Sequence, residues 1–227
     1  MQEPSLKIPI AIAIGGIVVA GAVYFTMRAQ EPSTASGHGN PALVRPVDSS
    51  DHIFGNPAAP VKIVEYADLY CEYCQGFSNT LEQVVANAGA KGSVAWVFRE
   101  FPLYEIHPNA EAGAEAAECV AQTGGNDAFW KFENLMFEKQ PVDPAQYGAL
   151  AQQAGAPGNA FATCYTNASS TVAARVSADR QNALDTGAAG TPYSLILVNG
   201  KAPVVMDGAY SYDAVMQLVN QALQGAQ

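Results

Sequence analysis

Positive charge is scarce in this chain of 227 residues. The sequence has 11 Lys and Arg but 21 Asp and Glu, so its formal net charge is −10 at pH 7. A surface of this sign repels a phosphate backbone, because binding to nucleic acid depends largely on contacts between Lys or Arg and phosphate. We therefore expect no nucleic-acid partner.

Cysteine and histidine are also few. The four Cys are at positions 71, 74, 119 and 164, and the three His are scattered at 38, 52 and 107. A zinc site of the ribbon type needs a second C-x-x-C or a pair of His beside the first motif, and the sequence has neither. The pattern favours one reactive dithiol, Cys71 and Cys74, together with one structural bridge.

One long segment has no charged residue at all. Residues 8–27 read IPIAIAIGGIVVAGAVYFTM, with Lys7 before them and Arg28 after them. A helix of that length spans the roughly 30 Å of hydrocarbon in a bilayer. Residues 1–28 are therefore interpreted as a transmembrane anchor or a signal segment, cleavage after Ala22 being the less favoured alternative. Both interpretations export the rest of the chain.

A linker and one folded domain make up the remainder. Residues 29–55 are rich in Pro, Ser, Gly, Ala and Asn, which is typical of a flexible tether, so the domain is expected at 56–227. Val61–Ala67 and Ser93–Phe98 have the β-branched pattern of buried strands, and a helix is expected between them from about Glu72 to Ala88. This order predicts two parallel strands with a right-handed crossover.

The pattern changes in the second half of the chain. From about residue 107 to 189 the apolar period is helical, and Gly, Pro and Asp divide this segment into four or five helices. Tyr193–Val198 and Pro203–Met206 then read as a hairpin around Asn199-Gly200, and a last helix is expected at about 211–223. The sequence thus predicts an α/β fold in which a helical block is inserted into a mixed sheet.

Cys71-Glu72-Tyr73-Cys74 lies where the first strand ends and the helix begins. The first sulfur is therefore beside the unpaired N–H groups and the positive end of the helix dipole, which stabilise a thiolate. A low thiol pKa makes a sulfur reactive near neutral pH and a good leaving group, and the two-residue spacer lets the second sulfur close a ring. The motif predicts a redox pair that works without metal or cofactor.

Further motifs accompany this pair. They are Glu65-Tyr66-Ala67-Asp68-Leu69-Tyr70 directly before it, then Arg99-Glu100-Phe101-Pro102-Leu103, His107-Pro108-Asn109-Ala110, Ala116-Ala117-Glu118-Cys119 and Gly190-Thr191-Pro192. In this order, from about residue 56 to 223, the sequence resembles the DsbA-like thioredoxin family in its single-chain, extracytoplasmic form. The resemblance implies a thioredoxin-like fold with a helical insertion between the second strand and the strand after Pro192.

The resemblance also implies roles for particular residues. Pro192 is expected in cis against the cysteine pair, with Thr191 presenting backbone groups to a peptide, whereas an ordinary trans proline is the alternative. Glu65 corresponds to a buried acid that exchanges a proton with Cys74, a role that Asp68 could share. If Glu65 instead faces water at the edge of its strand, that role is lost.

Cys119 and Cys164 fall on the apolar stripes of two different expected helices. Some members of the family carry a second bridge between these helices, and outside the cytoplasm the pair would oxidise if the helices pack together. A structural disulfide is therefore expected, and two reduced, buried thiols are the alternative. His107 is interpreted as part of a helix entry rather than as a general base.

By this resemblance the chain is a membrane-anchored thiol-disulfide oxidoreductase with its domain outside the cytoplasm. Its partners are expected to be exported proteins bearing thiols or disulfides, and a quinone-linked membrane oxidase for reoxidation. An isomerase or reductase of the same fold stays open, because negative Glu72 should make the pair less oxidising. A module that binds a soft metal ion through Cys71 and Cys74 is the alternative from a different class.

An uncleaved anchor at residues 8–27 should keep the full-length protein in the membrane fraction after a carbonate wash, because burial of about twenty apolar residues is not reversed by high pH. A variant that lacks residues 1–28 is the control and should be released. Recovery of a soluble form whose N-terminus lies beyond Ala22 would show cleavage instead.

Overall fold

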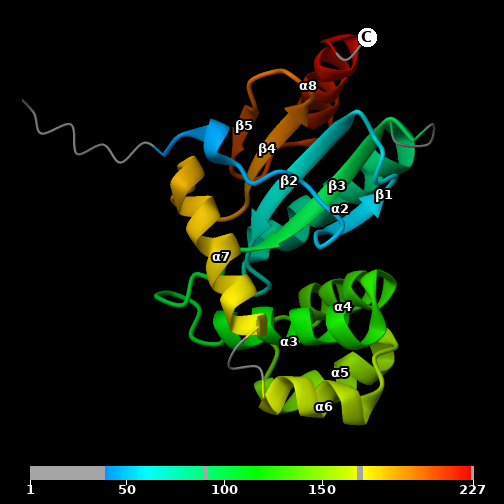
Figure 1. Cartoon of the computed structure of the whole chain (residues 1–227), viewed down its shortest axis with the longest axis vertical. Coiled ribbons are helices and arrows are strands. Elements are labelled where there is room, and N and C mark those ends of the chain that lie inside the picture. Colours follow the sequence, from blue (N-terminus) through cyan, green and yellow to red (C-terminus); the bar gives the residue numbers. More distant parts are fainter. Residues whose placement is uncertain (1–38, 89–91, 168–170, 226–227) are drawn as a thin grey trace, which may run out of the picture. The chain divides into compact units, whose positions relative to one another are not determined.

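The computed structural model describes residues 39–88, 92–167 and 171–225. Within them five strands form one sheet in the order β1-β3-β2-β4-β5 (Figure 1). The strands are β1 (His52–Gly55), β2 (Val61–Ala67), β3 (Val94–Glu100), β4 (Tyr193–Val198) and β5 (Val204–Asp207). β2 and β3 are parallel, as expected for the strand-helix-strand unit, and the other neighbours are antiparallel.

Helix α2 (Glu72–Ala88) connects β2 to β3, and α8 (Tyr212–Gly225) ends the described chain. Between β3 and β4 the structure has α3 (Ala110–Gly124), α4 (Asn126–Glu138), α5 (Tyr147–Ala154), α6 (Gly158–Thr166) and α7 (Thr171–Thr186), with the short 3-10 helix η3 (Pro144–Gln146) before α5. Figure 1 shows α3 to α6 gathered as a block and α7 returning from it toward the sheet. The predicted α/β class with a helical insertion is confirmed.

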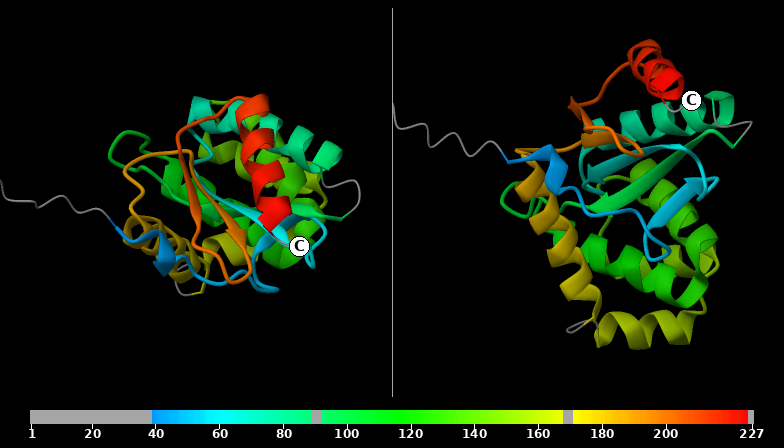
Figure 2. Two further views of the ribbon diagram at one scale, coloured as in Figure 1. Left: turned by 90° about the horizontal axis from the view of Figure 1, so that it is seen from above. Right: turned by 45° about the horizontal axis from the view of Figure 1, so that its top comes forward.

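Helices cover both faces of the sheet. Successive side chains of a strand point to opposite faces. Val61 and Ile63 of β2 pack into the cluster that contains residues of α2, α8 and the helical block, whereas Val64 and Tyr66 pack with Ala183 of α7. Views from two directions show α2 and α8 on one side and α7 on the other (Figure 2). Because of this double cover, β2 and β3 are buried along nearly their whole length, and most of their residues are apolar.

The folded unit begins earlier than the sequence predicts. Residues 39–55, expected to belong to a flexible linker, instead contain the 3-10 helix η1 (Pro41–Leu43) and the edge strand β1, which pairs with β3. The Asn40 N–H donates to the Asp185 carbonyl of α7 at 2.8 Å. The linker prediction is wrong for these residues because a four-residue strand and polar contacts hold them, and neither produces an apolar period.

The expected anchor at 1–28 and residues 29–38 lie outside the described residues. Within the part of the chain that the structure does describe, no helix is both long and apolar enough to cross a membrane.

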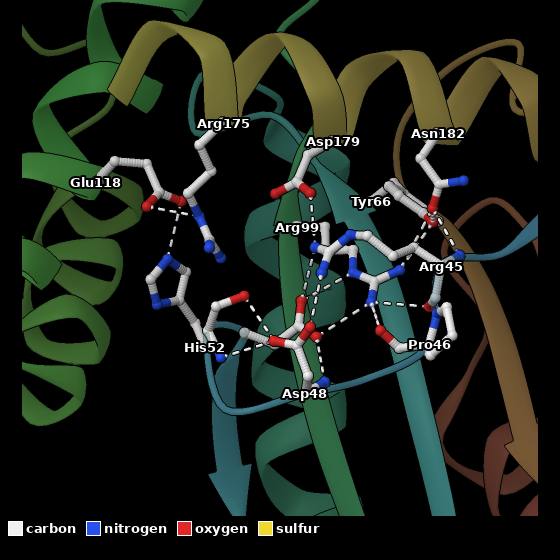
Figure 3. A network of polar contacts seen from close by, with 12 residues as sticks. Arg45, Pro46, Asp48, His52, Tyr66, Arg99, Glu118, Arg175, Asp179 and Asn182 are labelled. Carbon is white, nitrogen blue, oxygen red and sulfur yellow. Dashed lines mark hydrogen bonds and ion pairs between the residues drawn. The ribbon is translucent and has the colours of Figure 1, made fainter. Parts of the chain in front are cut away.

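Ion pairs attach this N-terminal segment to β3 and α7 (Figure 3). The fully buried Arg99 of β3 pairs with Asp51 at 3.0 Å and donates to the carbonyl oxygens of Arg45 and Pro46. Arg45 then bridges Asp51, at 3.0 Å, and Asp179 of α7, at 2.9 Å. Charged groups are rarely buried unless they are paired in this way. The network therefore fixes residues 45–51 across the face of the sheet.

A disulfide joins Cys119 of α3 to Cys164 of α6. Cys119 is fully buried in the main core. The bond closes a loop with a sequence separation of 45 residues and joins two helices of the helical block.

With Cys71 and Cys74 mildly reduced beforehand, thiol counting in denaturant should find two free thiols, because the Cys119–Cys164 bond persists. Replacing Cys119 and Cys164 together by Ala should lower the free energy of unfolding by about 3 to 4 kcal/mol, the estimate for closing a loop of this length. A Cys71→Ser/Cys74→Ser control should show no free thiol and near-normal stability. Four free thiols in the wild-type chain would contradict the bridge.

Candidate active site

The cysteine pair lies at the junction between β2 and α2. Strand β2 ends at Ala67, a short turn follows, and the Cys71 N–H donates to the Asp68 carbonyl at 3.0 Å one residue before α2 begins. Cys71 is 5% exposed, Cys74 is 0% exposed, and both are free thiols. One sulfur thus reaches the surface while the other is one turn inside the protein.

The two thiols differ strongly in acidity. A hydrogen bond from the Cys74 thiol lowers the pKa of Cys71 from 9.0 to about 6, assisted by Thr191 and by N–H groups at the start of α2 and opposed by burial. Burial raises the pKa of Cys74 well above 9.0, and the hydrogen bond to Cys71 and the charge of Glu65 raise it further. At neutral pH the pair therefore consists of a Cys71 thiolate and a Cys74 thiol.

Thr191 and Pro192 lie beside this pair. The Thr191–Pro192 peptide bond is cis, and the Cys71 sulfur is 3.5 Å from the Thr191 carbonyl oxygen. Pro192 is buried directly before β4, which pairs with β2. This strand pairing is what brings together two segments that are 120 residues apart in the sequence.

Glu65 of β2 is the carboxyl group that couples to Cys74. Its side chain is 0% exposed, and neither oxygen has a hydrogen-bond partner of good geometry among the described residues. Burial raises the pKa of Glu65 to about 8, an effect that the Trp96 indole opposes in part and the charge on Cys71 increases. Glu65 therefore does not face water at a strand edge, and its charge acts directly on the pKa of Cys74.

Asp68 forms a pair with His107 that the sequence interpretation missed. The buried Asp68 carboxylate accepts hydrogen bonds from His107 Nδ1 at 2.9 Å and from the N–H groups of Leu103 and Tyr70, each at 2.8 Å. These contacts tie the loop after β2 to the loop after β3. Loops that follow adjacent parallel strands meet at one edge of a sheet, and this was the signal that could have revealed the pair.

A cavity of about 700 Å³ opens beside Cys71. Apolar side chains contribute much of its lining, among them Tyr73, Leu103, Ile106 and Pro141. Tyr73 and Ile106 are 65% and 67% exposed, which is unusual for side chains of this size in the folded unit. Across residues 39–88, 92–167 and 171–225, no group of three or more His, Cys, Asp or Glu is arranged so as to hold a metal ion.

The sequence model of the family described as Thioredoxin matches residues 48–221. The chain belongs to the thioredoxin family. Among solved structures it is similar to BdbD of Bacillus subtilis, with 23% identity and a TM-score of 0.68 over 79% of this chain and 96% of that one. It is also similar to α-DsbA1 of Wolbachia pipientis, with 20% identity and a TM-score of 0.68 over 82% and 97%. The predicted thioredoxin family is thereby confirmed, and so is the predicted DsbA-like fold.

Curated relatives are longer proteins. The chain is 34% identical to Na(+)/H(+) antiporter NhaA 1 of Mycolicibacterium gilvum over 163 residues, which are 70% of this chain and 25% of that protein. It is 30% identical to NhaA 1 of Salinispora arenicola over 185 residues, which are 81% and 26%. The chain therefore spans about a quarter of the length of these relatives, and the likeness concerns a segment of each.

With the Cys71–Cys74 pair reduced and the Cys119–Cys164 bond intact, alkylation of the folded domain should occur at one residue with a midpoint near pH 6. Cys71 is the partly exposed thiolate, whereas Cys74 is buried and protonated throughout this range. Iodoacetamide labelling across pH, read by peptide mass spectrometry, measures both the midpoint and the site. Labelling of Cys74, or a midpoint near 9, would contradict the acidity assigned to the pair.

Proposed function

We propose that this chain oxidises pairs of thiols in exported proteins, with Cys71 as the attacked sulfur and Cys74 as the resolving one. A substrate thiolate attacks Cys71 in the oxidised enzyme, the Cys71–Cys74 bond breaks, and a mixed disulfide forms. A second substrate thiolate then attacks the substrate sulfur of that mixed disulfide and Cys71 leaves as a thiolate. Two electrons pass to the enzyme, which is left reduced, and the substrate gains one disulfide.

The difference in acidity within the pair is the observation that carries this proposal. A thiolate that the protein stabilises lowers the free energy of the reduced enzyme and so makes its disulfide more oxidising. The Cys71 pKa of about 6 is below the value of about 7 in thioredoxin, though above the value of about 3.5 in DsbA. Glu72, expected to oppose the helix dipole, is exposed and is not among the principal influences on the Cys71 pKa. Oxidation is therefore favoured over reduction.

The surroundings of Cys71 support a peptide substrate. The apolar cavity accepts side chains of an unfolded segment, and the Thr191 backbone beside the sulfur offers hydrogen bonds to an extended chain, with buried Pro192 behind it. The structural Cys119–Cys164 bond supports an oxidising compartment, because such bonds are rare in the cytoplasm. Together with the apolar segment at 8–27, this favours a tethered enzyme outside the cytoplasm that a quinone-linked membrane oxidase reoxidises.

Substitution of the resolving cysteine should trap substrates. In Cys74→Ser the Cys71 thiolate has no partner to expel a bound thiol, so mixed disulfides with exported proteins should accumulate in the host. Cys71→Ser is the matched control, and it should trap none and should lose activity by at least about 100-fold in oxidising a reduced, unfolded protein. Non-reducing gels followed by mass spectrometry identify the adducts.

Adducts that accumulate on the Cys71→Ser variant would reverse the two roles. Adducts confined to cytoplasmic proteins would contradict the location. Pro192→Ala in the Cys74→Ser background should slow the release of trapped substrates by added thiol, because it changes the surface on which the peptide lies.

A further inference from the structure

A second buried acid lies near the active site without a role in the exchange described so far. Glu133 of α4 is 0% exposed, and among the described residues neither of its carboxyl oxygens has a hydrogen-bond partner of good geometry. Its neighbours on the helix, Phe129, Trp130 and Phe132, are buried and apolar. Burying an unpartnered carboxyl group is costly, and packing alone would favour an apolar residue at this position.

Glu133 is on the face of α4 that lies against the Glu65 region of the sheet. Phe129 and Trp130 precede it by four and three residues and so share its face. Both pack on Phe98, with ring centroids 5.5 and 6.3 Å apart, and Phe98 is the β3 residue paired with Glu65 of β2. Burial raises the pKa of Glu133 well above 4.5, and the charge of Glu65 is the next largest cause of this rise. The two carboxyl groups are therefore close enough to influence each other.

Helix α2 provides the third side of this cluster. Cys74, Ser78 and Glu82 are spaced by four residues, so they occupy successive turns of one helix face. Cys74 and Ser78 are buried, and the half-buried Glu82 accepts a hydrogen bond from Asn134 of α4 at 3.1 Å. Asn134 directly follows Glu133. The face of α2 thus leads from the resolving sulfur to the surface, and α4 meets it at the outer end.

We propose that Glu133 is a proton relay residue of the disulfide exchange, which passes a proton between Glu65 and the half-buried Glu82. It acts through Glu65 and touches no reacting sulfur. The inference rests on the proposed roles of Cys74 and Glu65, but it holds for either direction of electron flow.

The proton balance is as follows for substrate oxidation. The substrate thiolate forms a bond to the Cys71 sulfur, and Cys74 leaves with the electron pair of the broken bond. The Glu65 carboxyl gives its proton to the Cys74 thiolate and becomes a buried carboxylate. The Glu133 carboxyl then gives its proton to Glu65 and regains one from solvent by way of Glu82. Reoxidation moves each proton in the opposite direction.

The charges around Glu133 explain why a second acid is useful. Besides burial, the charges of Glu65 from β2 and Glu82 from α2 raise the pKa of Glu133, and Ser78 of α2 lowers it. No Lys or Arg of the described residues is among the causes. His52 of β1 stacks on Phe129 of the same helix but is paired with Glu118 at 2.8 Å, and Tyr147 of α5 lies against Phe132. Without a cation nearby, a buried carboxylate on Glu65 is costly. A proton that Glu133 passes to Glu65 neutralises it and leaves the negative charge closer to the surface.

The test is the single-turnover reduction of the Cys71–Cys74 bond by dithiothreitol, measured in the full chain as a function of pH and corrected for the thiolate fraction of the reagent. Below about pH 8, where Glu65 holds its proton, Glu65→Gln and Glu133→Gln should each slow the reaction by about tenfold. Above that pH the three proteins should converge. The double variant should be no slower than Glu65→Gln, because both residues serve one proton path.

Glu138→Gln is the matched control, since Glu138 is exposed at the end of the same helix, and it should follow the wild-type profile. Three results would overturn the relay. The first is a rate profile of Glu133→Gln equal to that of this control, and the second is a loss of rate of the same size at every pH. The third is a double variant in which the two losses of rate multiply. If Glu133→Gln does not fold, Glu82→Gln should show a smaller loss of rate, limited to the same pH range. A Glu82→Gln variant with an unchanged rate would then overturn the relay. Dithiothreitol replaces the protein substrate, so an error in the proposed direction of oxidation leaves these profiles unchanged.

Discussion

Hydrogen bonds that converge on the Cys71 sulfur are the interaction on which the rest of the structure depends. They come from the Cys74 thiol and from N–H groups at the start of α2, and the Thr191 carbonyl oxygen lies 3.5 Å from the same sulfur. The donors all belong to the first turn of α2, which follows β2, whereas Thr191 lies beside the sulfur only because β4 pairs with β2. Their sum makes a thiolate stable at a site that is 5% exposed. The order of the strands in the sheet therefore influences the pKa of Cys71.

Buried ionisable groups are paired with opposite charges at one place in the domain and unpaired at another. Arg99 and Asp51 are both fully buried in their side chains and pair at 3.0 Å, and Arg45 adds a second cation that reaches Asp179. In that network each charge is paired with an opposite one, and the pairs hold the N-terminal segment in place. Glu65 and Glu133 are equally buried, but they are held without cations and with raised pKa values. Carboxyl groups with raised pKa values hold a proton near neutral pH and form no ion pair between elements. This suits a position near Cys74, a thiol that gains and loses a proton in each exchange.

The sequence revealed those features that local pattern encodes. The C-x-x-C motif at the end of a β-branched strand gave the reactive pair and α2, and helical periodicity gave the inserted block. The position of Glu65 came from resemblance, and the structure places it in the core as expected. Residues 39–55 have the composition of a linker because β1 is short and its neighbours are held by long-range ion pairs, which leave no local pattern. The Asp68–His107 contact and the place of Glu133 could not be seen, because both depend on which strands and helices become neighbours in space.

The central claim is that the protein stabilises the Cys71 thiolate enough for the pair to act as an oxidant. The most direct measurement is the reduction potential of the Cys71–Cys74 pair, obtained by equilibrating the purified domain with glutathione redox buffers at neutral pH. With a Cys71 pKa of about 6, the account predicts a potential on the order of −200 mV, between those of thioredoxin, about −270 mV, and DsbA, about −120 mV. A value at or below that of thioredoxin would contradict the account, because the disulfide would then be too stable to be passed on to exported proteins.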